Sequence, residues 1–306
     1  MSLMRNALLA ASTNAWLREH AMRRTFVRRS VSRFMPGEHL EDALRAARDL
    51  RAPTILTHLG ENLASVAEAE AVTNHYLEVL DCIAAEGLDA QVAVKPTQLG
   101  FDYQPALCQR NLDRLVERAE DRKNVIWIDM ESSRYVDPTL ALFRAARATS
   151  ARVGVALQAC LYRTAGDVEA LLPLGAAIRL VKGAYLEAPH IAYPMKPDVD
   201  ENYYRLACRI LIGGSSRPGA MLHIATHDRV LIDRLLAFIE ERHVAPSAYE
   251  FAMLYGIQRG QQQQLIDAGR RLRVLISYGE YWFPWYMRRL AERPANVGFV
   301  IRSLFG

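Results

Sequence analysis

Short apolar runs alternate with longer amphipathic stretches along most of the chain after residue 50. Each short run has the length and apolar character expected of a strand that is buried on both faces. The stretches between them repeat apolar residues every three or four positions and carry charges on the opposite side, which predicts surface helices. The strand-like runs begin at Thr54, Ala90, Asn124, Arg152, Ala176, Ala220, Tyr249 and Leu272.

Strand-like runs that are each followed by a helix-like segment predict a closed (β/α)8 barrel of the TIM type. An open doubly wound sheet usually has fewer strands. The chain has 306 residues, which exceeds the roughly 250 that such a barrel needs. We therefore expect a catalytic barrel over residues 51–306, preceded by a helical extension over residues 1–50.

The composition narrows the functional classes. With 51% hydrophobic residues, 24% charged residues and a formal net charge of +4, the chain is an ordinary globular protein. It lacks a long Lys/Arg run after the first forty residues, which argues against nucleic-acid binding. Four cysteines without CxxC spacing and eight scattered histidines argue against a metal site, and we expect reduced thiols in a cytoplasmic protein.

The first 38 residues are rich in arginine and carry apolar residues at helical spacing. They lack the long apolar centre of a signal peptide. This segment predicts either an extra helix packed on the domain or a helix that lies on a membrane surface. No run of about eighteen apolar residues occurs, so we expect no membrane-spanning helix.

Polar residues gather where five consecutive predicted strands end. In a (β/α)8 barrel the active site lies at the carboxyl ends of the strands. One such residue alone is usually a salt-bridge partner or a helix cap, but five strands in a row indicate one polar ligand at a common mouth. The residues are Lys95, Asp129, Glu131, Gln158, Arg179, Lys182, Thr226, His227 and Asp228.

Short motifs exclude some chemistries. The chain has no GxSxG, GxGxxG or GxxxxGKS sequence, which disfavours a serine hydrolase, a Rossmann dinucleotide site and a P-loop. Two other chemistries stay open. Lys95 or Lys182 could be the Schiff-base lysine of a barrel aldolase. Arg179, Lys182 and the amides around Gly183 could instead hold a phosphate.

Two adjacent arginines, Arg288 and Arg289, stand in the aromatic segment YGEYWFPWYMRRLAERP. Neighbouring arginines repel each other and are costly to bury without anions. They fit a surface helix in which Glu292 pairs with Arg288. They also fit a site that holds a carboxylate or phosphate through bidentate hydrogen bonds.

Six motifs in order resemble the proline dehydrogenase family, whose members are flavin-dependent (β/α)8 enzymes. The resemblance extends from about residue 50 to the end of the chain. The motifs are VAVKPTQLG (92–100), WIDMESS (127–133), RLVKGAYLE (179–187), IATHD (224–228), EFAMLYG (250–256) and WYMRRLAERP (285–294).

The resemblance implies that Lys95, Arg288 and Arg289 hold a substrate carboxylate, with the arginine pair on a final helix that covers the barrel mouth. It also implies that Tyr185 packs beside that pair and that Glu292 binds one of the arginines. Arg179 would reach toward flavin N5. The implied cofactor-binding residues are Asp129, Gln158, Arg179, Val181, Lys182, Gly183, Ala225, Thr226, His227, Asp228, Leu254 and Arg289, and Asp129 lies near the substrate as well.

The implied reaction is the oxidation of L-proline, or of a closely related cyclic secondary amino acid, to Δ1-pyrroline-5-carboxylate with bound FAD. Hydride leaves the ring carbon next to nitrogen for flavin N5, and the electrons pass to a quinone-type acceptor. A membrane acceptor would give the basic N-terminal segment a role as a peripheral contact with the inner face of the cell membrane. The competing hypothesis is a barrel that has lost its redox activity and acts as a binding module.

Three positions depart from the family pattern. Leu275 and Trp285 stand where active-site tyrosines are usual, and Ala252 replaces a glutamine that contacts the cofactor. The first two changes make the pocket for the substrate ring more apolar. A substituted proline such as hydroxyproline, or a larger ring homologue, is therefore a second candidate substrate.

Overall fold

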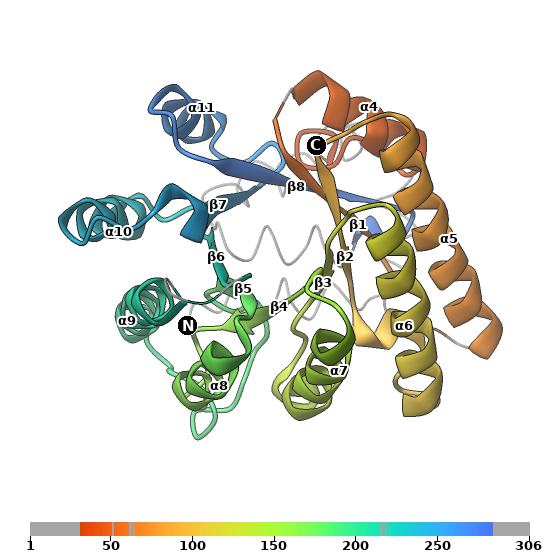
Figure 1. Ribbon diagram of the computed structural model, residues 1–306, viewed down its shortest axis with the longest axis horizontal. Coiled ribbons are helices and arrows are strands. Elements are labelled where there is room, and N and C mark those ends of the chain that lie inside the picture. The colour runs from red at the N-terminus through yellow and green to blue at the C-terminus, as the bar shows by residue number, and fades with distance from the viewer. Residues whose placement is uncertain are drawn as a thin grey trace, which may run out of the picture.

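The computed structural model describes residues 31–50, 52–60, 63, 65–214, 217 and 219–283. In this part of the chain parallel strands form a closed barrel in the order β1 to β8, and β8 pairs with β1 (Figure 1). The strands are β1 Thr54–His58, β2 Ala90–Val94, β3 Ile126–Ile128, β4 Val153–Gln158, β5 Ala177–Val181, β6 Met221–Ala225, β7 Tyr249–Leu254 and β8 Leu272–Tyr278. Each lies within one of the predicted apolar runs, so the predicted (β/α)8 barrel is confirmed.

Helices surround the barrel, and the helix beside β8 comes from before the barrel rather than after it. Figure 1 shows α4 between α11 and α5, in the place that the eighth barrel helix would occupy. Short 3-10 turns follow some of the strands and helices. The helices are α4 Leu40–Leu50, α5 Val66–Ala85, α6 Pro105–Asp121, α7 Val136–Thr149, α8 Thr164–Leu171, α9 Lys196–Gly214, α10 Arg229–Glu241 and α11 Arg259–Asp267, and the 3-10 turns are η1 Pro96–Leu99, η2 Ser133–Tyr135, η3 Leu172–Leu174 and η4 Pro246–Ala248.

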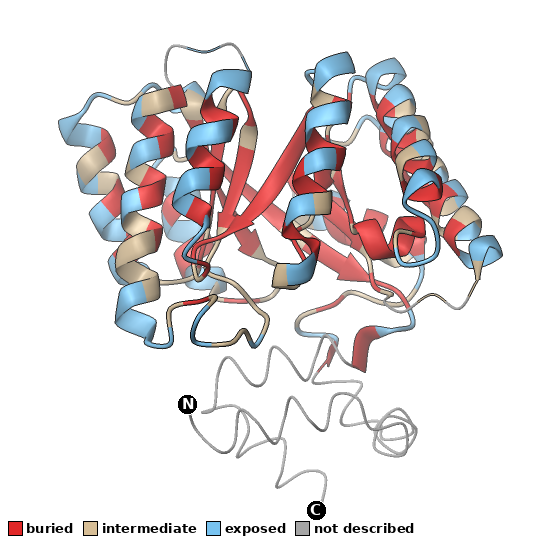
Figure 2. Ribbon diagram, turned by 90° about the horizontal axis from the view of Figure 1, so that it is seen from below, coloured by how far each residue is buried: buried red, intermediate tan, exposed pale blue. Residues whose placement is uncertain are grey.

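The core has two layers because successive side chains of a strand point to opposite faces. In β1, Leu56 points outward and packs with the helices, whereas Ile55 points inward. The inner layer contains Ile55, Ala93 and Trp127, with Leu275 packed against them. Figure 2 shows the buried strands between helices whose outer faces are exposed.

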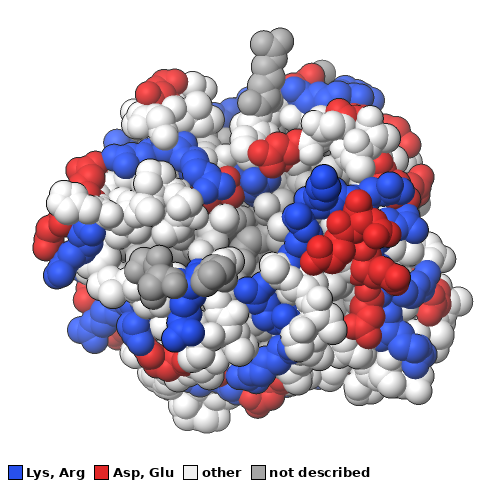
Figure 3. All heavy atoms as spheres, in the orientation of Figure 1, with Lys and Arg blue, Asp and Glu red and all other residues white. Residues whose placement is uncertain are grey.

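Ion pairs link neighbouring helices on the outer surface of the barrel. Asp81 on α5 accepts from Arg118 and, at 2.8 Å, from Arg122 across the boundary with α6. Figure 3 shows acidic and basic side chains mixed on the face in view, so this face has no broad region of one sign. Such exposed pairs add little stability.

Two predicted segments lie outside the described residues. These are residues 1–30 of the N-terminal extension and the final helix within residues 284–306. The described end of the extension, α4, contributes Leu40 and Leu44 to the outer core of the barrel. The boundary at residue 50 stays a prediction. In the described part of the chain, no helix has both the length and the apolar character needed to cross a bilayer.

Candidate active site

Two cations share one carboxylate at the carboxyl end of the barrel. Lys95 follows β2 and Asp129 follows β3. Arg179 lies in β5, where its neighbours Ile178 and Leu180 point outward, so the Arg179 side chain points into the barrel. Lys95 Nζ lies 3.6 Å from Asp129 Oδ2, and Arg179 Nη2 donates to Asp129 Oδ1. Because Arg179 is only 3% exposed, water screens this pair poorly. The group carries one positive charge in excess and therefore favours an anion.

The second terminal nitrogen of Arg179 is unsatisfied. Arg179 Nη1 is buried and has no hydrogen-bond partner among the residues that the structure describes. A buried donor without an acceptor costs free energy. This nitrogen could therefore donate to an acceptor atom of a ligand.

Gln158 and Gly183 lie next to each other where β4 and β5 end. Gln158, at the end of β4, is 2% exposed and donates from Nε2 to the Glu131 carbonyl at 2.8 Å. Gly183, two residues after β5, has φ +116°, and a Cβ there would lie 2.3 Å from Cys160 Sγ and 3.4 Å from Gln158 Oε1. Val181 and Lys182 precede this glycine. Only glycine fits at this position, because any side chain would collide with Cys160, so this segment can offer backbone groups to a planar ring system.

Four charged residues join the ends of β5 and β6 to the start of α9. Lys182 Nζ donates to Asp200 and, at 2.7 Å, to Asp228 Oδ2, and Lys196 also binds both carboxylates. Burial alone would raise the pKa of Asp228, but hydrogen bonds from the two lysines lower it to about 2. Lys182 is thus already neutralised, so a phosphate would gain less from it than the sequence suggests. Asp200 and Lys196 were not predicted from the sequence, although their spacing of four at the start of a helix was an available signal.

The connections after β6 and β7 are tied together through one histidine. The backbone amide of Leu254 donates to His227 Nε2 at 3.2 Å, which requires an unprotonated Nε2. Gln258 Nε2 donates to the His227 carbonyl at 3.0 Å. Thr226 Oγ1 accepts from the Asp228 amide at 3.1 Å and so fixes the turn into α10. These predicted residues therefore lie together at the mouth.

Hydrogen bonds that were not predicted from the sequence link the connection after β3 to the connection after β5. The amide and the hydroxyl of Ser133 donate to Glu187 at 2.7 and 2.6 Å. The half-buried Tyr185 lies in the same β5–α9 connection, two residues before Glu187. Ser133 and Glu187 both belong to family-like motifs, but nothing in their spacing indicates this contact.

Two of the positions that depart from the family pattern lie inside the barrel. Leu275 in β8 is partly buried and packs against Ile55, Ala93 and Trp127. Ala252 in β7 is aligned with Ala225 of β6, and both side chains are small. The remaining predicted site residues, Trp285, Arg288, Arg289 and Glu292, lie outside the described residues.

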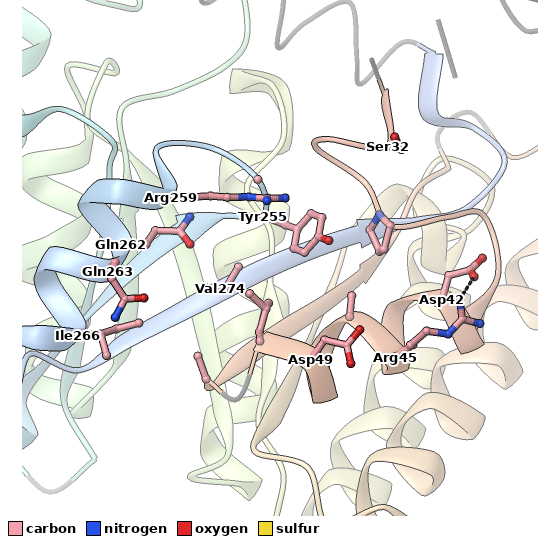
Figure 4. Close-up of a pocket in the computed structure, with 15 residues that line it drawn as sticks. Ser32, Asp42, Arg45, Asp49, Tyr255, Arg259, Gln262, Gln263, Ile266 and Val274 are labelled. Atoms are coloured by element: carbon pink, nitrogen blue, oxygen red, sulfur yellow. Dashed lines mark ion pairs between the residues drawn. The ribbon is translucent and has the colours of Figure 1, made fainter. Parts of the chain in front are cut away.

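A groove lies on another part of the surface, away from this mouth. It has a volume of about 460 Å³ and lies on the outer side of the barrel, between α4 and α11, where Val274 of β8 lines it (Figure 4). None of the predicted site residues lines it. No group of three or more His, Cys, Asp or Glu side chains that could hold a metal ion occurs in the described part of the chain.

The sequence profile of the proline dehydrogenase family matches residues 40–302. The chain belongs to this family. "Proline dehydrogenase 2" of Bacillus subtilis subsp. natto is 34% identical over 307 aligned positions, covering 99% of both chains. "Proline dehydrogenase" of Deinococcus radiodurans is 36% identical, covering 90% of this chain and 89% of the relative. The predicted family resemblance is thus confirmed.

A solved structure shows the same fold. Proline utilization A from Bdellovibrio bacteriovorus, inactivated by N-propargylglycine, superposes with a TM-score of 0.81 at 22% identity and covers 95% of this chain. The chain spans only 36% of that protein's length. At this identity the comparison supports the fold alone.

Proposed function

We propose that this chain is an FAD-dependent enzyme that oxidises L-proline, or a closely related cyclic secondary amino acid, to Δ1-pyrroline-5-carboxylate. The observation that carries the proposal is the shared carboxylate at the mouth, where Lys95 and Arg179 both bind Asp129 and Arg179 Nη1 is left for a ligand. Membership of the proline dehydrogenase family supports the substrate class.

The excess positive charge at the mouth suits the anionic form of an amino acid in two ways. Lys95 would hold the substrate carboxylate, together with Arg288 and Arg289 from outside the described residues. A ring amine bound nearby meets two cations and one carboxylate, so its neutral form is favoured over the ammonium form. The neutral amine is the form whose lone pair can drive loss of hydride from the adjacent carbon.

The residues present fit a flavin. The orphaned Arg179 Nη1, the backbone surface at Gly183 and the neighbouring Gln158 amide would hold its ring system. Thr226, His227, Asp228, Ala225 and Leu254 would hold the remainder of FAD, with Val181 and Lys182 beside them. Bound flavin supplies a two-electron acceptor for hydride. The chain's own task is to orient the substrate, keep its amine neutral and exclude water.

A substituted proline or a larger ring is the second candidate substrate. Leu275 lies in the apolar inner cluster with Ile55 and Trp127, so the inner wall has no hydroxyl at this position. An apolar wall binds a substrate ring with an extra carbon better than a ring with an extra hydroxyl group, which would be buried without a partner. We infer a preference for ring homologues over hydroxyproline, and a Leu275→Tyr variant that oxidises L-proline at the same rate would argue against a role for this residue in specificity.

Neither a Schiff-base aldolase nor a binding module gains support from the geometry. A Schiff-base lysine must be a free amine. Lys95 is engaged by Asp129, and Lys182 by two carboxylates. The unsatisfied donor of Arg179 does not discriminate against a binding module, because any ligand acceptor could satisfy it. Borohydride trapping with a carbonyl substrate would distinguish the aldolase.

We further propose a quinone-type electron acceptor and a peripheral membrane contact through residues 1–38. Deleting these residues should weaken binding to anionic lipid vesicles, while leaving the flavin spectrum intact. Unchanged vesicle binding would refute the contact.

The deciding experiment is an anaerobic titration of the purified protein with L-proline while the visible flavin spectrum is recorded. Loss of the flavin absorbance supports the proposed reaction. A Lys95→Met variant should retain the flavin and need a much higher proline concentration for the same loss of flavin absorbance. A flavin that stays oxidised with proline but bleaches with a ring homologue would favour the second substrate, and a protein without flavin would refute the proposal.

A further inference from the structure

The centre of the barrel is filled by Trp127, a residue that the proposed function has not used. It lies in β3, is 1% exposed, and donates from Nε1 to Gln91 Oε1 at 2.7 Å. A Cβ on Gly154 of the neighbouring β4 would lie 2.6 Å from two carbons of the indole ring. The ring is therefore wedged in one orientation.

The guanidinium of Arg179 lies over this ring. Its Cζ is 5.3 Å from the ring centroid, within the range of a cation–π interaction. Asp129 binds only one of the terminal nitrogens. With a single hydrogen bond, the planar guanidinium could still rotate about that bond. Contact with the flat indole ring restricts the rotation.

A neutral imidazole lies on the same ring. The centroids of His223 and Trp127 are 4.2 Å apart, and His223 is fully buried. Its Nε2 lies 3.2 Å from Glu250 Oε2, outside hydrogen-bond geometry. Burial lowers the pKa of His223 to about 4, so near neutral pH no second cation approaches Arg179 from this side. Arg273, at 2.9 Å, balances the charge of Glu250 instead.

We propose that Trp127 is a positioning residue whose indole face holds the Arg179 guanidinium against Asp129 and keeps Nη1 directed at the ligand. The inference deepens the proposed function and rests on it, because it concerns the arginine assigned there to the flavin. It assigns to Trp127 a role that acts through Arg179.

The test compares Trp127→Phe, which keeps an aromatic face, with Trp127→Leu, which removes it. Phe143→Leu is the matched control, because Phe143 on α7 is also fully buried but belongs to the outer core. The first readout is the guanidinium ¹⁵N–¹H signal of Arg179 in the full chain, assigned with Arg179→Lys. A ring beneath it shifts this signal upfield, and the shift should persist in Trp127→Phe and Phe143→Leu and vanish in Trp127→Leu.

The second readout is the midpoint potential of bound flavin. Reduction adds negative charge, which a well-placed guanidinium stabilises, so Trp127→Leu should weaken this stabilisation about tenfold. For a two-electron couple that lowers the potential by about 30 mV. Phe143→Leu should lose stability without a change in potential.

Unchanged Arg179 signals and an unchanged potential in Trp127→Leu would overturn the inference and leave Trp127 as filler of the barrel. The guanidinium signal does not depend on flavin or turnover. A protein that fails the proline titration can therefore still confirm or refute the role of Trp127, which separates this inference from the proposed function.

Discussion

Replacing Asp129 by asparagine tests how far the buried arginine depends on its single carboxylate. Asparagine keeps the shape and one acceptor oxygen but removes the charge. Arg179, at 3% exposed, then has no anionic partner among the described residues. Removing one partner of a buried ion pair costs about 3–5 kcal/mol. We expect about 3 kcal/mol, because the amide oxygen can still accept from Arg179.

This free energy corresponds to a measurable shift in melting temperature. An unfolding entropy of roughly 2 cal/mol/K per residue gives about 0.6 kcal/mol/K for 306 residues, so Asp129→Asn should melt about 5 °C lower. Thermal unfolding followed by circular dichroism measures it. Lys95→Met is the control. The side chain of Lys95 is 14% exposed and its Nζ lies 3.6 Å from Asp129 Oδ2, beyond hydrogen-bond distance, so we expect a fall below about 2 °C.

The double variant Asp129→Asn with Arg179→Met removes both charges together. It should be more stable than the sum of the single effects predicts, because no uncompensated charge stays buried. The reasoning is refuted if Asp129→Asn melts like the unaltered protein, or if the two single effects simply add.

Three further predictions concern the rest of the site. Gly183→Ala should reduce flavin retention on gel filtration, since φ is +116° and the new Cβ would meet Cys160; retention equal to the parent's would show that the backbone can shift. Glu187→Gln should raise KM more than it lowers kcat, because it weakens the tie to Ser133 between two mouth connections; unaltered kinetics would make that tie dispensable. Burial lowers the pKa of His223 from 6.5 to about 4 in the folded protein. As pH falls, the unfolded chain therefore takes up this proton before the folded protein does, and the free energy of unfolding should fall by about 3 kcal/mol between pH 6.5 and pH 4. Urea unfolding of His223→Gln should show a shallower fall over that range, and an identical pH profile would contradict the assignment.

The sequence determined the fold through its pattern of apolar runs. Strands buried on both faces must be nearly all apolar, and helices over a barrel must be apolar on one side, so the two kinds of segment are readable from local spacing. The polar strand ends at Lys95, Asp129 and Gln158 were readable for the same reason. A polar side chain at the end of an apolar strand stands out in the sequence, and five such strand ends in succession indicate a common site.

The contacts that give the site its character came only from the tertiary structure. The sequence does not reveal that Asp129 is shared by Lys95 and Arg179, or that Lys182 is neutralised by carboxylates from α9 and the end of β6. It gave no signal for Trp127 beneath the arginine. Asp129 and Arg179 are 50 residues apart in the chain, and Lys182 and Asp228 are 46 apart. Closure of the barrel brings all the strand ends into one ring, and the distances across that ring follow from register and twist rather than from any local pattern.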